Sequence, residues 1–252
     1  MGEIVDLIDK IKRYFKFSPS EIRGLILAIF VTAFIISFRE WGRGDEINFA
    51  FGGLNFFNAI LIVTLSFLVH ISIQRIFGLI TGLRVEWKMW GFGLLLGLIF
   101  AFLSNGNIWL ILAGGIIVHH TGGHRLGWFR YDINWWALAM ITVVGPVASM
   151  ALAVVFKALG VAISTALIQK AIVFNIAYAL YSILPIPPLD GSRVVYGSRM
   201  LYVFTAAGLV ATAILLSLNI SVWLAVISSF LVGALIWLLY YIFFESKWWA
   251  GA

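Results

Sequence analysis

Few groups in this sequence could do chemistry, and the most informative is one carboxylate. Asp190 lies in the segment Leu184-Pro185-Ile186-Pro187-Pro188-Leu189-Asp190-Gly191, at the end of an apolar run. Prolines break a helix and free its backbone amides and carbonyls, and irregular backbone at membrane depth persists only where protein or a water-filled cavity covers it. We therefore expect Asp190 to face the interior of a helix bundle, as a candidate functional residue.

The four histidines are the other candidate groups, and three of them lie close together. His119, His120 and His124 fall within one polar segment, and the last two have the spacing that would place both on one helix face. The glycine pair between them disfavours a helix, so the preferred interpretation is an interfacial loop with titratable histidines. The alternative is a substitute metal site that combines these three histidines with His70 or Asp190.

The composition predicts that these groups belong to a membrane protein. The 252 residues are 62% hydrophobic and 11% charged, with a mean hydropathy of +1.03, which excludes a water-soluble globule and predicts a multi-pass membrane protein. The net charge of +6 comes largely from connecting segments. This pattern favours contact with a lipid bilayer, and no nucleic-acid-binding motif accompanies it.

The apolar runs predict an all-α fold, a polytopic transmembrane helix bundle. Residues 1–17 read as an amphipathic interfacial helix, and Ser18-Pro19-Ser20-Glu21 has the pattern of a helix start. Residues 18–252 then form a single transmembrane domain of about six or seven spans. The predicted runs are 24–38, 57–80, 90–103, 108–118, 135–156, 162–184, 201–218 and 222–244, with a polar connection over 39–56.

Two of these runs are short for a full span. The runs 90–103 and 108–118 are expected to be either one broken helix or a re-entrant pair.

The basic residues predict the topology. Basic residues before the first span and after the second would share one side, which predicts a cytoplasmic N-terminus in a protein of the cell membrane. Four basic residues would mark a polar pathway if they faced the bundle interior, but their positions near run ends favour snorkelling to an interface: Arg75, Lys157, Lys170 and Arg193.

The proline-rich segment resembles a known motif. Pro185, Pro187, Leu189, Asp190 and Gly191 follow the third-ligand pattern of the site-2 protease family of intramembrane zinc metalloproteases. That family has a preceding HExxH helix with a glycine eight residues after the second histidine, and a middle Ala-Gly-Pro-x-x-Asn motif.

Two further parts of the family pattern can be placed on this chain. Gly78 selects the window 66–70 as the HExxH position, while Gly145 and Pro146 occupy the middle motif. Residues 85–95 are similar to archaeal members. The resemblance implies a site-2 protease-like core over about residues 57–199.

The same window lacks most of the chemistry that the resemblance implies. Ser66 stands where the first histidine would be, and Phe67 stands where a glutamate would deprotonate the zinc-bound water. His70 is retained. If His70 is taken as the first histidine instead, Ile71 and Gln74 replace the glutamate and the second histidine, so either register loses the general base.

Two serines replace asparagines that the family carries. Ser182 precedes the proline-rich segment, and Ser149 falls in the middle motif. Serine keeps a hydroxyl but loses the paired donor and acceptor of the amide. The two replacements therefore indicate that the site as a whole does not depend on the hydrogen bonds that the asparagine amides would make.

Two interpretations of His70 and Asp190 follow. In one they form a buried pair with Ser66 and Ser182 nearby, because either group alone in lipid costs a few kcal/mol. In the other, His70 is a satisfied core histidine and Asp190 caps a broken helix end. Neither gives hydrolysis.

Three functions remain open, and the first is preferred. It is a site-2 protease-like protein that has lost catalysis, needs no cofactor and binds a transmembrane helix or partner subunit. The second is an intramembrane zinc metalloprotease whose ligands come from His70, Asp190, His119, His120 and His124. The third is a small transporter, for which interior charges are few and no inverted repeat is found.

Overall fold

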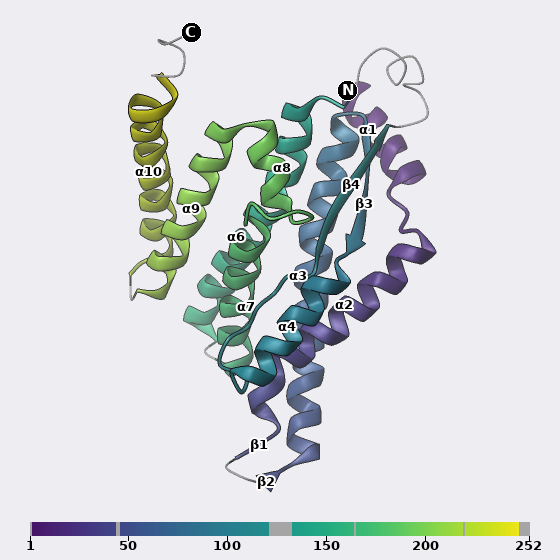
Figure 1. Cartoon of the computed structure of the whole chain (residues 1–252), viewed down its shortest axis with the longest axis vertical. Coiled ribbons are helices and arrows are strands. Elements are labelled where there is room, and N and C mark those ends of the chain that lie inside the picture. Colours follow the sequence, from purple (N-terminus) through teal and green to yellow (C-terminus); the bar gives the residue numbers. More distant parts are fainter. Residues whose placement is uncertain (1, 44–45, 121–132, 164, 219, 247–252) are drawn as a thin grey trace. The chain divides into compact units, whose positions relative to one another are not determined.

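The computed structural model describes residues 2–43, 46–120, 133–163, 165–218 and 220–246. The chain divides into two compact units, Met1–Asn134 and Trp135–Ala252 (Figure 1). Each unit is built mainly of helices, so the predicted helical membrane fold is confirmed at this level.

The first unit begins with a short helix and a well-capped span. Helix α1 covers Gly2–Tyr14 and helix α2 covers Pro19–Ser37, followed by the 3-10 turn η1, Phe38–Glu40. The Ser18 hydroxyl accepts from the Glu21 amide at 3.2 Å, and a Glu21 carboxylate oxygen accepts from the Ser18 amide at 3.3 Å. This capping box confirms the helix start predicted from the sequence.

Helix α3, Phe49–Ile80, is the longest element of the unit. It follows the small hairpin of β1, Gly42–Arg43, and β2, Glu46–Ile47. The Asn48 side chain caps α3 by accepting from the Phe51 amide at 3.1 Å, so the helix begins eight residues before the predicted run. The expected polar connection over 39–56 is therefore shorter than predicted.

A two-stranded antiparallel sheet within the first unit corrects the all-α prediction. Strand β3, Leu83–Met89, pairs antiparallel with β4, Gly114–His120, in seven residue pairs. The run 108–118 was expected to be helical, but its second half forms β4. The buried apolar residues Leu83, Val85 and Trp87 of β3 alternate with more exposed charged residues, which is the period of a strand that faces a core on one side.

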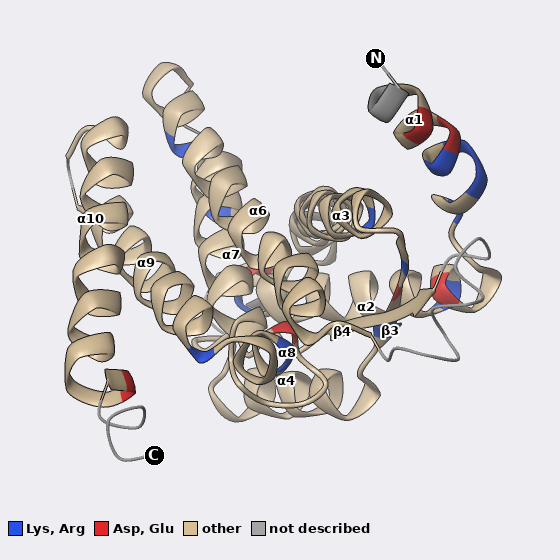
Figure 2. Cartoon of the chain, turned by 90° about the horizontal axis from the view of Figure 1, so that it is seen from above, with Lys and Arg blue, Asp and Glu red and all other residues tan. Residues whose placement is uncertain are grey.

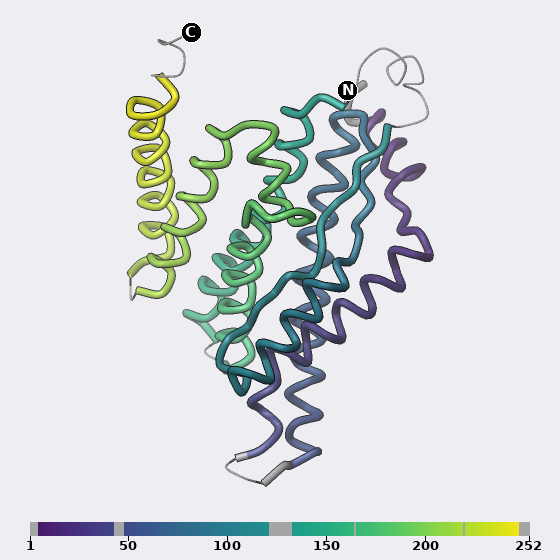
Figure 3. Tube along the Cα trace, in the orientation of Figure 1, coloured from purple at the N-terminus to yellow at the C-terminus, as the bar shows by residue number. Residues whose placement is uncertain are grey.

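Helix α4, Gly91–Leu103, connects the two strands. Its 13 residues span only about 20 Å, less than the hydrocarbon core. The chain then returns without helix to β4, and Figure 3 shows this return segment running beside α4. A β-carbon on Gly93 or Gly97 would overlap the carbonyl oxygen of Leu112 or Leu110, so glycines permit this close packing.

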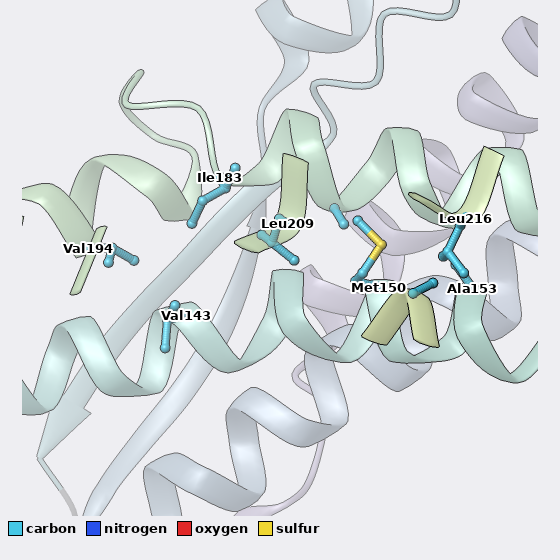
Figure 4. Close-up of a cluster of buried hydrophobic side chains, with 9 residues drawn as sticks. Val143, Met150, Ala153, Ile183, Val194, Leu209 and Leu216 are labelled. Atoms are coloured by element: carbon cyan, nitrogen blue, oxygen red, sulfur yellow. The ribbon is translucent and has the colours of Figure 1, made fainter. Parts of the chain in front are cut away.

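The described residues of the second unit form five helices and a π-helical turn. The elements are α6 Trp135–Ala162, α7 Ala166–Ser182, α8 Asp190–Gly197, α9 Arg199–Ser217, α10 Val222–Tyr240 and η3 Tyr241–Glu245. Helix α6 packs against α7 and α8, and α9 packs against α10. Val143, Met150, Leu209 and Leu216 belong to the buried cluster that joins α6 to α9 (Figure 4).

The helices identify a multi-pass membrane protein. Among the described residues, five helical segments are long and apolar enough to cross a membrane: Pro19–Glu40, Phe49–Ile80, Trp135–Ala162, Arg199–Ser217 and Val222–Glu245. Helices α4 and α7 are apolar but shorter. Figure 2 shows charged residues gathered on α1 and sparse along α9 and α10, as expected if the long helices face lipid.

Candidate functional site

Helix α3 positions the window that corresponds to HExxH. Ser66 and His70 lie four residues apart and are both buried, and Gln74, four residues further, is buried as well. They form a polar stripe along one face of a mostly apolar helix. The Ser66 hydroxyl donates to the Ile62 carbonyl at 2.8 Å, so its hydrogen is taken up by its own helix.

Phe67 fills the position of the family's catalytic glutamate. Its side chain is fully buried, and its ring centroid lies 6.2 Å from that of Trp87 on β3, at 45° between the planes. An aromatic ring packed between α3 and β3 cannot accept a proton from water. A packed aromatic ring therefore occupies the position that the resemblance assigns to the general base.

Replacing Phe67 with leucine is expected to lower the free energy of unfolding by about 1–2 kcal/mol, because the smaller side chain leaves part of the ring's volume empty. The same substitution at Phe57, which is 57% exposed on α3, should cost less than about 0.5 kcal/mol. Thermal unfolding in detergent measures both. Equal shifts in the two variants would show that the Phe67 ring is not specifically packed.

The second unit holds the retained carboxylate at a helix start. Helix α7 ends at Ser182, whose hydroxyl donates to the Ala179 carbonyl at 3.0 Å. The chain then turns through the proline-rich segment, and α8 begins at Asp190. Asp190 is only 2% exposed, which confirms that it is buried. Leu189 is the residue at the cap position and Asp190 is the first residue of the helix, so the interpretation that Asp190 caps this helix end stays a prediction.

The neighbours of Asp190 include two polar side chains of its own unit. Arg193 and Tyr178 are both close enough for electrostatic interaction with its carboxylate. A guanidinium nitrogen of Arg193 also donates to the Pro188 carbonyl at 2.8 Å, across the turn before α8. The polar neighbours of Asp190 thus come from its own helix and from α7, and Arg193 is partly buried there.

The middle motif lies inside α6. Gly145 and Pro146 are buried, and so is Ser149 one turn later. The leucine of the proline-rich motif, Leu189, is also buried. These positions form part of the interior of the second unit, as expected for motif residues that pack helices together.

The predicted partners are distributed over both units. His70 belongs to the first unit and Asp190 to the second, so their pairing stays a prediction. His119 and His120 end β4, and His124 lies outside the described residues. The His119 Nε2 atom is 3.7 Å from a Glu86 carboxylate oxygen. In the described part of the chain, no three His, Asp or Glu side chains gather as metal ligands would.

A buried ion pair in the first unit was not predicted from the sequence. Arg75 on α3 is 2% exposed and bonds the carboxylate of Glu21 on α2, which is 4% exposed. The expectation that Arg75 snorkels to an interface is wrong. Two backbone carbonyls, Phe15 at 3.2 Å and Lys16 at 3.1 Å, accept from its guanidinium, and the Phe17 ring centroid lies 4.0 Å from the guanidinium carbon.

The same ion pair connects several elements. The Glu21 oxygen that bonds Arg75 also accepts from the Trp87 amide at 2.9 Å, which ties β3 to the start of α2. The Ser18 hydroxyl donates to Glu86 on the same strand at 2.7 Å. Residues 15–21, α3 and β3 are therefore held together by one polar cluster. The capping box indicates Glu21, but no local pattern pairs it with an arginine 54 residues away.

Comparison of the chain with protein-family models, curated proteins and solved structures finds no match. The likeness to site-2 proteases therefore depends on the motif residues alone, and the protease-like core over residues 57–199 stays a prediction.

Proposed function

We propose that this chain is a site-2 protease-like membrane protein without peptidase chemistry, which acts by binding a transmembrane helix or a partner subunit. The observation that carries the proposal is the burial of Phe67 against Trp87 at the position of the missing glutamate. A site that kept its hydrolytic role would need a proton acceptor there.

The donor set of the window also does not fit zinc. A catalytic zinc site uses three protein ligands and leaves the fourth position to water. His70 is the one nitrogen ligand that the window 66–70 supplies, and the Ser66 hydroxyl is engaged by the Ile62 carbonyl. We therefore derive no reaction step through a metal at this position.

An apolar groove on the second unit supports a binding role. A hollow of about 530 Å³ between α7 and α9 is lined mainly by large apolar residues such as Ile176 and Leu180, with the small residues Ala177, Ala213 and Ser217 between them. In lipid, small residues allow another helix to approach closely, and this close contact drives helix association. The groove thus offers a surface of the kind that a transmembrane helix binds.

Zinc content and peptidase activity of the purified protein test this proposal together. We expect less than about 0.1 zinc per chain after purification without chelator, because too few ligands are present. We also expect no cleavage of a transmembrane peptide. About one zinc per chain together with cleavage, both lost in His70→Ala and Asp190→Ala, would instead support the metalloprotease with an atypical ligand set.

A further inference from the structure

A pocket of about 660 Å³ lies in the first unit between the start of α2 and the β3–β4 sheet. It is separate from the window 66–70 on α3, and the proposed function does not use it. Its lining combines basic side chains with an apolar wall.

The basic part of the lining consists of Arg23 on α2 and Lys88 on β3, both exposed. Neither residue forms an ion pair with any other part of the chain that the structure describes. Of the two acidic groups of the pocket, Glu21 is compensated by Arg75, while Glu86 keeps its charge and accepts from Ser18. The two cations outnumber this one carboxylate, so the lining keeps a net positive charge. Two cations are therefore available to a ligand.

The apolar wall lies beside these cations. Leu27, Met89 and Ile117 contribute to it, together with the buried ring of Trp87. A fully hydrated anion would gain nothing from this wall. A molecule with a charged head and an apolar body would match both parts of the lining.

The position of the pocket along α2 specifies the surroundings of such a molecule. The candidate span Pro19–Glu40 begins at this end, and Arg23 lies in its second turn. The end of a membrane span meets the phospholipid headgroups. Basic pockets between helices at that depth bind anionic headgroups.

We propose that this pocket binds one anionic phospholipid of the surrounding membrane. Arg23 and Lys88 contact the phosphate-bearing headgroup, and Leu27, Met89 and Ile117 contact the upper part of an acyl chain. The proposal is independent of the loss of peptidase chemistry, since all of these residues lie outside the window 66–70.

Native mass spectrometry with added phosphatidylglycerol or phosphatidylcholine tests the pocket. We expect wild-type protein to retain phosphatidylglycerol preferentially, and R23E/K88E to bind it about thirtyfold more weakly or worse, since each basic group that contacts the bound headgroup contributes about fivefold. The matched control K12E/R199E makes the same change in net charge at exposed residues outside the pocket. It should lose less than about threefold.

The remaining outcomes decide against the proposal. Equal retention of the two lipids by the wild type, or equal losses in the pocket and control variants, would overturn it. Displacement of the lipid by millimolar inorganic phosphate would assign the site to a soluble anion instead. If R23E/K88E fails to fold, R23Q/K88Q carries the same test, with an expected loss of at least about tenfold and wild-type binding as the overturning result.

Discussion

Arg75→Met is expected to lower the free energy of unfolding by about 3–5 kcal/mol, because removing one partner leaves the other charge buried and uncompensated. Glu21 is 4% exposed, so water cannot replace the guanidinium. The carbonyls of Phe15 and Lys16 lose their donor as well. The unfolding midpoint in detergent should fall by roughly 10 °C, since 1 kcal/mol corresponds to a few degrees in a chain of this size.

The companion variant Glu21→Gln/Arg75→Met separates the charge from the packing. Glutamine keeps an acceptor for the Trp87 amide and can still complete the capping box, so the double variant should recover most of the lost stability. Arg199→Met, an exposed control on α9, should change stability by less than about 0.5 kcal/mol. A loss below about 1 kcal/mol in Arg75→Met would mean that water reaches the pair.

The buried pair also bears on the window in α3. Glu21 fixes the backbone of β3 at Trp87, and the Trp87 ring is the one that packs on Phe67. The polar cluster therefore holds in place the aromatic contact that occupies the position of the missing base. A rigid face of α2, α3 and β3 suits a protein that binds a partner without changing its covalent structure.

Local patterns predict the parts of this fold that depend on local physics. The capping box at Ser18, the end of α7 before the prolines and the burial of Asp190 all follow from residue types close together in the chain. The long spans follow from length and apolar composition. Each of these features was readable without knowledge of any distant contact.

The features that were missed depend on distant partners. A short apolar run such as 108–118 fits a helix or a buried strand equally well, and only pairing with β3 decides between them. Arg75 could have reached an interface, but residues 15–21 fold over it and supply a carboxylate, carbonyls and an aromatic ring. The packing of Phe67 likewise requires Trp87, twenty positions away.

Gly191→Ala is expected to destabilise the second unit by about 4 kcal/mol or more, because the new methyl group meets backbone that cannot move aside alone. A β-carbon on Gly191 would overlap the carbonyl group of Ile183 and lie 2.6 Å from the Leu184 carbonyl oxygen. Relieving the overlap would require separating the end of α7 from the start of α8. The yield of folded protein and the thermal unfolding midpoint measure the effect.

Gly208→Ala is the matched control, since a β-carbon there meets nothing within 4 Å. Its expected effect is neutral to about 1 kcal/mol stabilising, because alanine favours the helix over glycine. Equal midpoints for Gly191→Ala and the wild type would disprove the close approach of the two backbone segments. If the predicted loss of stability is found, Gly191 is required for the close packing of these two backbone segments. The Leu-Asp-Gly sequence then has a structural role that does not depend on catalytic chemistry.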